Sequence, residues 1–436
     1  MKNTPIPAEI VDKLVAESGI SSVGKASIRE VKRLINDIEQ ASGKEFVRME
    51  MGIPGLPPCQ VGVEAQIEAL KKGVAAIYPD IEGIPELKKE AARFVKNFID
   101  LEVDPENCIP TVGSMMGGMA GFMTFVRCRK ERDTTLFIDP GFPVQKQQHR
   151  VMGLKYETFD VYEHRGPKLR AKLESYLEKG NIHTIMYSNP NNPSWICFTE
   201  EELQIIGDVA NKYDVFVFED LAYFGMDFRQ NISAPGIPPY QPSVGKYTDN
   251  YALLISGSKA FSYAGERIAL MIMSKKLYNR EFDDLEPYFK MKKLGRAIIY
   301  GTVYAISSGV AHSAQYAMAA ILKACNDGTY NYIEDVKEYG EKAAIMKKMF
   351  LDNGFEIVYD KDGDKPLADG FYFTVAYPGM SSDELLHEFL YYGVSAISLS
   401  TCGSERSEGL RACVSLTPRR QFPILEERLK LFKANH

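Results

Sequence analysis

The chain has 436 residues, 45% hydrophobic and 25% charged, so it is long enough to form two or three domains around a large core. Its 52 lysines and arginines are outnumbered by 58 aspartates and glutamates, and the net charge of -6 excludes the basic excess typical of nucleic-acid binding. The longest apolar runs, such as 268–273, are too short to cross a bilayer, so we expect no membrane partner.

The cysteines and the start of the chain favour a cytoplasmic protein. The seven cysteines include no C-x-x-C pair, and the polar start Met1-Lys2-Asn3-Thr4 has no signal-peptide pattern. Both features are typical of a reduced, cytoplasmic protein. The six histidines lack metal-binding spacing, so we expect no metal.

The predicted elements begin with two helices in residues 1–50, and a turn-rich stretch at 52–58 follows them. From about residue 60 to 320, helical patterns separate most of a series of apolar, strand-like runs. These runs are 108–112, 135–139, 184–188, 215–219, 252–256 and 268–273. Such alternation predicts right-handed crossovers and a largely parallel sheet with helices on both faces, although the last two runs are close enough to be antiparallel.

The pattern changes beyond residue 325, where a long helix at 332–350 precedes short strands and two further helices. We therefore expect an N-terminal helical segment (1–50) packed on the small domain, a large domain (51–324) and a small α+β domain (325–436). The segment Arg229–Asp249 contains four prolines and no regular pattern. Because long loops in compact domains are usually functional or mobile, we expect it to border the active-site entrance or a dimer interface.

The residues that follow the predicted strands carry the chemistry. They are Gly113-Ser114-Met115, Pro140-Gly141-Phe142-Pro143, Asn189-Pro190-Asn191-Asn192-Pro193, Asp220-Leu221-Ala222-Tyr223, and Gly257-Ser258-Lys259 with Arg267 beyond it. Loops at the carboxyl ends of parallel strands converge on one crevice. We therefore expect a helix N-terminus, an aromatic ring, an amide, a carboxylate, a phenol, an amine and a guanidinium to share that crevice.

This set of groups fits a phosphorylated, cationic heteroaromatic cofactor that carries an aldehyde, and pyridoxal 5′-phosphate (PLP) is the candidate. Its aldehyde needs a lysine, and its ring nitrogen needs an acidic partner. Its phosphate needs an arginine and the N–H groups at the start of a helix. Lys259 lies between two apolar strands, where desolvation would lower the pKa of the amine and make it a nucleophile.

Several motifs, in the same order, resemble the class I/II PLP-dependent aminotransferases of fold type I, typified by aspartate aminotransferases, from Gly52 to Arg411. They are Tyr78-Pro79-Asp80-Ile81-Glu82-Gly83 with Pro85-Glu86-Leu87, the Asn189–Pro193 and Asp220–Tyr223 segments, and Ser256-Gly257-Ser258-Lys259 with Gly265-Glu266-Arg267. The resemblance implies a large domain with a mostly parallel central sheet flanked by helices, and a smaller α+β domain.

The resemblance also implies how the cofactor is bound. Lys259 would hold PLP as a Schiff base, Asp220 would keep the ring nitrogen protonated, and Tyr223 and Asn192 would hydrogen-bond its phenolic oxygen. The remaining cofactor-binding residues would be Arg267, Ser256, Gly113, Ser114 and Met115 around the phosphate, Phe142 stacked on the ring, and Tyr78 reaching the phosphate of a neighbouring subunit. The role of Tyr78 implies a homodimer.

The same resemblance implies the reaction. Arg411, Asn192 and Gly52 would bind the substrate, and Lys259 would move the proton from the substrate's Cα. The overall reaction would transfer an amino group between an L-amino acid and a 2-oxo acid in ping-pong fashion. Which bond at Cα breaks depends on substrate orientation, so a PLP decarboxylase or β-lyase on the same fold is the alternative. A PLP-sensing regulatory domain is a more distant alternative. It would need a basic helix-turn-helix segment before the fold, and we expect the short N-terminal stretch to leave no room for one.

Two positions leave the substrate open. Family members usually have glycine where this chain has Trp195, its only tryptophan, and the indole would either narrow the substrate pocket or pack below it. No second arginine falls at the spacing expected for reading an acidic side chain, and Arg296 is only a loose candidate.

Overall fold

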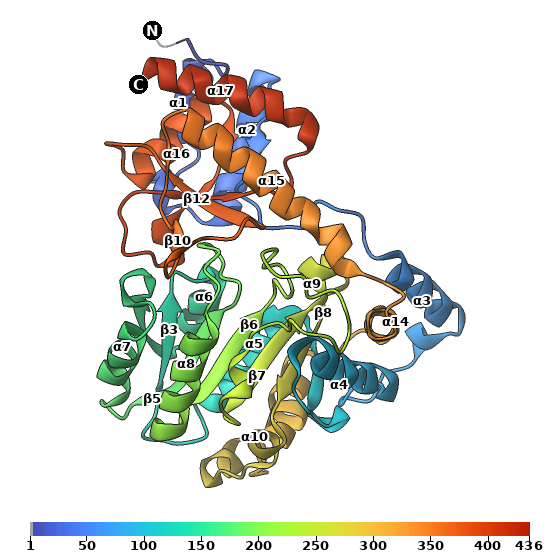
Figure 1. Ribbon diagram of the computed structural model, residues 1–436. Helices are drawn as coiled ribbons and strands as arrows, with labels where there is room; N and C mark the ends of the chain where they lie inside the picture. The colour runs from blue at the N-terminus through green and yellow to red at the C-terminus, as the bar shows by residue number, and fades with distance from the viewer. Residues whose placement is uncertain (1–2) are drawn as a thin grey trace.

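A seven-stranded sheet forms the centre of the larger lobe of the molecule (Figure 1). The computed structural model describes residues 3–436. Across the sheet the strands are β2 (Cys108–Val112), β8 (Ile268–Met273), β7 (Tyr251–Ser256), β6 (Phe216–Leu221), β5 (Ile182–Ser188), β3 (Thr134–Asp139) and β4 (Lys155–Asp160). All neighbours are parallel except β8, which is antiparallel to β2 and β7. The mostly parallel sheet and its antiparallel last pair confirm the prediction, whereas the half-exposed edge strand β4 was not predicted.

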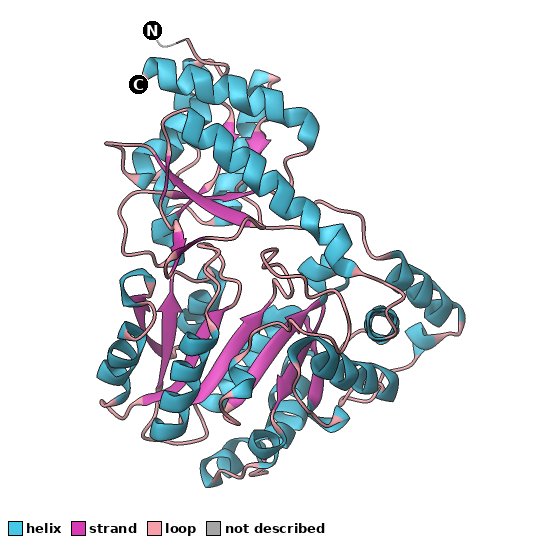
Figure 2. Cartoon of the chain, viewed as in Figure 1, coloured by secondary structure: helices cyan, strands magenta, loops and turns pink. Residues whose placement is uncertain are grey.

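Helices cover both faces of this sheet (Figure 2). Side chains alternate along β7 between two apolar cores, with Leu253 and Ile255 in one and Ala252 and Leu254 in the other, as the two-residue period of a strand requires. The helices of this lobe are α3 (Gln60–Lys71), α4 (Pro85–Ile99), α5 (Gly113–Phe125), α6 (Pro143–Met152), α7 (Lys168–Leu177), α8 (Glu200–Tyr213), α9 (Gly257–Ala260), α10 (Lys275–Asn279), α11 (Glu286–Phe289), α12 (Leu294–Arg296), the π-helical turn Ala297–Val303, α13 (Tyr304–Ser307) and α14 (His312–Asn326).

The smaller lobe is built on a four-stranded sheet. Its strands are, in order, β14 (Ile397–Ser398), β15 (Leu410–Cys413), β12 (Tyr372–Ala376) and β9 (Glu356–Ile357), and its helices are α15 (Tyr332–Asp352), α16 (Ser382–Tyr391) and α17 (Phe422–Asn435). The N-terminal helices α1 (Ala8–Glu17) and α2 (Ile28–Ser42) lie in the same lobe (Figure 1), and β1 (Val47–Arg48) pairs in parallel with β13 (Val394–Ser395). The start and end of the chain therefore belong to one packing unit.

The proline-containing segment Arg229–Asp249 lies against the larger lobe without strands or long helices of its own. The N–H of Gly236 donates to the carbonyl of Asn97 at 2.9 Å, and the N–H of Gln241 donates to that of Phe98 at 2.8 Å, which fixes the segment along α4. Its first residue, Arg229, reaches the smaller lobe instead.

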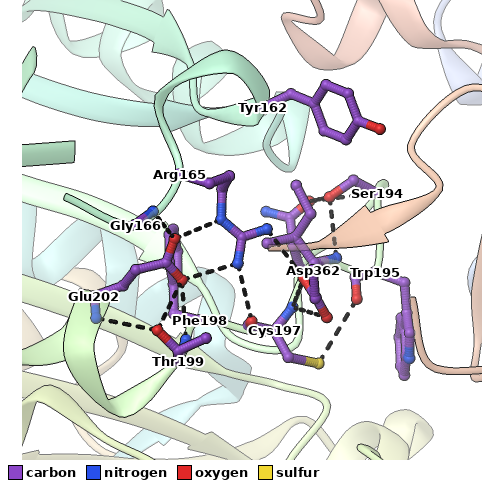
Figure 3. A network of polar contacts seen from close by, with 12 residues as sticks. Tyr162, Arg165, Gly166, Ser194, Trp195, Cys197, Phe198, Thr199, Glu202 and Asp362 are labelled. Atoms are coloured by element: carbon purple, nitrogen blue, oxygen red, sulfur yellow. Dashed lines mark hydrogen bonds and ion pairs between the residues drawn. The ribbon is translucent and has the colours of Figure 1, made fainter. Parts of the chain in front are cut away.

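A short hairpin of the smaller lobe, β10 (Lys361–Asp362) and β11 (Lys365–Pro366), connects the two lobes. The buried Asp362 carboxylate accepts hydrogen bonds from Arg165 at 3.0 Å and from the N–H of Cys197 at 3.2 Å (Figure 3). It also accepts a hydrogen bond from Arg229 at 2.9 Å. Arg165 also pairs with Glu202 at 2.7 Å. One carboxylate of the smaller lobe therefore bridges two arginines of the larger lobe and holds the backbone that follows Trp195.

No helix of the described residues is long and apolar enough to span a bilayer. All seven cysteines are buried, and none of them forms a disulfide.

The Asp362 contacts lead to a test of lobe docking. We expect Asp362→Asn to lower the free energy of unfolding by about 3 kcal/mol, because it removes from each of two partly buried guanidinium groups one of its two carboxylate partners. Denaturant unfolding measures the effect, and Asp364→Asn on the exposed turn of the same hairpin is the matched control. Equal stability of the two variants would contradict the assignment of Asp362 as the inter-lobe anchor.

Candidate active site

The carboxyl ends of the parallel strands bring the sequence-predicted residues to one edge of the sheet. Asp220 near the end of β6 lies opposite Ser188, the last residue of β5, and opposite Leu254 of β7. Two residues beyond Leu254, β7 ends at Ser256 and α9 begins. Three segments far apart in the sequence therefore place their polar residues side by side.

Lys259 lies on the single turn of α9 immediately after β7. The hydroxyl of Ser256 accepts a hydrogen bond from the N–H of Ser258 at 3.1 Å and so caps this turn. Lys259 donates through Nζ to the carbonyl oxygen of Gly52, and Nζ lies 5.4 Å from the centre of the Phe371 ring. Desolvation lowers the pKa of this amine to about 8, although part of the residue remains accessible. Near neutral pH the amine is therefore much closer to its nucleophilic form than a surface lysine is.

Asp220 is a buried carboxylate with little local compensation. It accepts hydrogen bonds from the side-chain amide of Gln145 at 3.1 Å and from the N–H of Ala222 at 3.1 Å. Burial nevertheless raises its pKa to about 6. A cation bound beside it would restore the charged form, so the position suits a protonated ring nitrogen. Sequence reasoning missed Gln145, which lies one turn into α6, and a lone glutamine in a helix gives no signal of this role.

The start of α5 brings together groups that could hold an anion. Gly113 has φ 66°, and a Cβ there would lie 2.5 Å from the Arg267 guanidinium, so only glycine lets the arginine approach this closely. The Ser114 hydroxyl is buried and has no hydrogen-bond partner within residues 3–436. An unpaired hydroxyl, a helix N-terminus and a guanidinium together fit a phosphate group.

Arg411, on β15, is a buried cation with no carboxylate partner among the described residues. It is 1% exposed, and its guanidinium donates to the Glu50 carbonyl at 2.5 Å and to Oδ1 of Asn192 at 3.3 Å. Its Nε has no partner in the described chain. A buried guanidinium that carries only neutral acceptors is suited to bind a carboxylate ligand.

Three aromatic residues pack together beside Arg411, whose guanidinium lies over the ring of one of them, Tyr372. Tyr223 and Tyr372 share a hydrogen bond of 2.6 Å between their hydroxyl groups, and Trp195 packs edge-on against both rings, at 5.3 and 6.2 Å. Trp195 is only 1% exposed and has φ 65°, a left-handed conformation in which glycine is usual. The indole is therefore buried against two tyrosines of the candidate site.

Within the part of the chain that the structure describes, the remaining sequence-predicted residues make no contact with this aromatic cluster that involves their side chains. Phe142 is half-buried at the start of α6, and the backbone carbonyl of Met115 accepts a hydrogen bond from Gln148 at 2.7 Å. Tyr78 is 88% exposed, and Arg296 lies on the surface with its guanidinium 5.0 Å from the Tyr300 ring centre. Within one chain, neither Tyr78 nor Arg296 points into the crevice.

Comparisons with known proteins give the family. The family model for aminotransferase class I and II matches residues 44–422. The probable aspartate aminotransferase of Methanocaldococcus jannaschii is 24% identical over 334 residues, which are 72% of this chain and 85% of that protein. The LL-diaminopimelate aminotransferase of Natranaerobius thermophilus is 24% identical over 328 residues, 74% of this chain and 76% of that protein.

A solved structure gives the same fold. The alanine aminotransferase of Pyrococcus furiosus superposes with a TM-score of 0.75 at 21% identity, over 95% of this chain and 98% of that one. The chain therefore belongs to the class I and II aminotransferase family and is an aminotransferase, which confirms the resemblance and the fold class expected from its sequence.

The packing of Trp195 can be tested at Gly370, where a Cβ would collide with the indole ring. We expect Gly370→Ala to destabilise the protein by about 2 kcal/mol through overpacking. Because Trp195 is the only tryptophan, its fluorescence should also move to longer wavelength as the ring is displaced toward solvent. Gly265→Ala is the control, since a Cβ there meets open space. An unchanged emission spectrum in Gly370→Ala would refute this packing.

Proposed function

We propose that the chain binds PLP at this site and transfers an amino group between an L-amino acid and a 2-oxo acid in ping-pong fashion, with Lys259 as its catalytic lysine. The observation that carries the proposal is a desolvated Lys259 amine and a buried Asp220 carboxylate at the ends of neighbouring strands, together with the buried Arg411 guanidinium, which has no carboxylate partner among the described residues. The Lys259 amine matches the aldehyde of PLP, and the Asp220 carboxylate matches its protonated ring nitrogen. The Arg411 guanidinium matches the carboxylate of the substrate.

The residues fit each part of the cofactor. Arg267, Ser256 and the Gly113-Ser114-Met115 turn would hold the phosphate, Asp220 the ring nitrogen, and Tyr223 with Asn192 the phenolic oxygen. Phe142, at the start of α6, would lie against the ring face, and the buried unpaired hydroxyl of Ser114 supports the phosphate position. When bound, PLP supplies an electron sink for the pair released at the substrate's Cα.

The protein's own groups account for substrate binding and proton movement. Arg411 would hold the substrate carboxylate, with Asn192 and Gly52 lining the same position. The carboxylate would give the buried Arg411 guanidinium the negative partner it lacks. Lys259, once free of the cofactor, would take the Cα proton and return it as general base and acid, for which a pKa of about 8 is well suited.

We further propose that the protein acts as a homodimer in the cytoplasm. Tyr78, Ile77 and Tyr304 are 88%, 61% and 61% exposed, which is unusual for such large apolar side chains. Tyr78 and Tyr304 also line a groove of about 380 Å³ with Pro79, Ile81, Tyr300 and Ser308. A second copy covering this face would bring Tyr78 to the neighbouring site. The free, buried cysteines support a reducing compartment.

The central proposal is tested by cofactor capture. We expect purified protein to develop a visible absorbance band with PLP, and L-amino acid alone to convert that band to the pyridoxamine form. Lys259→Ala should lose the band and fall in turnover by about a thousandfold or more, because covalent attachment and proton transfer both depend on this amine.

Lys342→Ala is the matched control. Lys342 is also a buried lysine with a pKa lowered to about 8 by desolvation, but its Nζ donates to the carbonyl oxygen of Ser415 at 3.0 Å, whereas that of Lys259 donates to Gly52. Loss of the band in Lys342→Ala with retention in Lys259→Ala would overturn the assignment. Release of carbon dioxide or pyruvate, without conversion to pyridoxamine, would favour the decarboxylase or lyase chemistry.

The pH dependence of capture gives a separate expectation. Only the neutral amine attacks an aldehyde, so the capture rate should rise about tenfold per pH unit below pH 8 and level off above it, instead of rising to the pKa of an ordinary lysine. Stopped-flow absorbance of the apo-protein mixed with PLP measures this, with Lys259→Ala as the background. A rate that keeps rising beyond pH 9 would contradict a desolvated Lys259.

The dimer is tested by sedimentation. We expect two chains of 49.0 kDa each to sediment together at micromolar concentration, and Tyr78→Ala with Tyr304→Ala to shift the protein toward monomer. Tyr288→Ala, another 60% exposed tyrosine outside the groove, is the control. A monomeric unmodified protein would refute the proposal.

A further inference from the structure

Tyr372 is a second phenol at the candidate active site, and the resemblance assigned it no role. It comes from β12 of the smaller lobe, whereas Tyr223 follows β6 of the larger lobe, and their hydroxyl oxygens are 2.6 Å apart. The two residues are 2% and 4% exposed. A Cβ on Gly52 would collide with the Tyr372 hydroxyl, so this oxygen also lies directly against the backbone that accepts from Lys259.

The two hydroxyls hold two protons, and only one of these can lie between them. Burial raises the pKa of both phenols, so both are neutral at physiological pH. Tyr223 is the only hydrogen-bond partner of the Tyr372 hydroxyl within the described residues. If Tyr372 donates to Tyr223, the Tyr223 proton is free for a ligand. If Tyr223 donates to Tyr372 instead, the Tyr223 proton is not free for a ligand.

The surroundings of the two rings favour Tyr372 as the donor. The Arg411 guanidinium lies over the Tyr372 ring, 4.7 Å from its centre. A cation on the ring face withdraws electron density from the phenol and makes its O–H a stronger donor. Trp195 packs edge-on against both tyrosines and restricts their rings, and its own side chain adds no charge that would reverse the preference.

We propose that Tyr372 is a positioning residue, whose hydroxyl donates to Tyr223 and thereby directs the Tyr223 proton to the phenolic oxygen of the bound cofactor. The inference rests on the proposed function and deepens it, because it makes a residue of the smaller lobe part of the cofactor's hydrogen-bond chain. A donor that itself accepts a hydrogen bond is strengthened by cooperative polarisation. Correct docking of the smaller lobe would therefore tune the cofactor as well as complete the substrate site.

The test is a pH titration of the absorbance of the PLP-bound protein, which follows the proton on Lys259 Nζ after cofactor capture. The anionic phenolic oxygen of the cofactor stabilises this proton on the Lys259 nitrogen. A hydrogen bond that another group donates to the same oxygen weakens that stabilisation and lowers the pKa of the nitrogen. We expect Tyr223→Phe to raise this pKa by roughly 1–2 units, and Tyr372→Phe to raise it by roughly 0.2–0.5 units. Because Tyr372 acts through Tyr223, the double variant should equal Tyr223→Phe alone.

Tyr332→Phe is the matched control, since Tyr332 is another fully buried tyrosine and its hydroxyl has no partner in the described part of the chain. It should leave the titration unchanged. An unchanged or lowered pKa in Tyr372→Phe, or shifts that simply add in the double variant, would overturn the proposal. Thermal unfolding of the apo-proteins shows whether each variant folds. If Tyr372→Phe does not fold, Tyr372→His, which restores a polar donor, replaces it in the titration. Absence of any titrating band in the unmodified protein would instead refute PLP binding itself.

Discussion

The desolvation of charged groups at one edge of the central sheet is the constraint on which the site depends. Lys259, Asp220 and Arg411 are each held where water is scarce and where no ionic partner within the described chain compensates them. Folding tolerates such groups when a ligand or a function offsets their cost. Desolvation brings the pKa of the amine down to about 8 and that of the carboxylate up to about 6, so both lie within reach of neutral pH.

The proposed site draws its residues from both lobes, so the chemistry proposed for it requires the lobes to be docked. The larger lobe would supply the lysine, the aspartate and the phosphate-binding residues from the ends of strands of the central sheet and the turns that follow them. The smaller lobe supplies Arg411 and Tyr372 from neighbouring antiparallel strands, in which Phe373 pairs with Ala412. The Asp362 anchor holds the lobes together on the side of Trp195, so the loop that carries Asn192, a proposed substrate-binding residue, also contacts this ion cluster.

The sequence was sufficient for the parts of this arrangement that have local signals. Apolar runs ending in small or polar residues predicted the strands from β2 to β8, except β4, whose edge position leaves it half-exposed and without a clear pattern. The crevice residues followed because parallel strands place their carboxyl ends together. Gln145, Asp362 and the hydroxyl of Tyr372 could not be predicted, because their roles depend on partners 75, 133 and 149 residues away, respectively. The packing direction of Trp195 also required the structure, since it depends on the space beside Gly370.

The most direct measurement of the central claim is to incubate the protein with PLP, reduce it with borohydride and locate the modified residue by peptide mass spectrometry. Reduction converts the lysine–cofactor linkage into a stable bond, so the site of attachment is read without any assay of turnover. The account predicts a single labelled peptide that contains Lys259 and accounts for about one cofactor per chain. Labelling of Lys342 or of several surface lysines, with Lys259 unmodified, would contradict it.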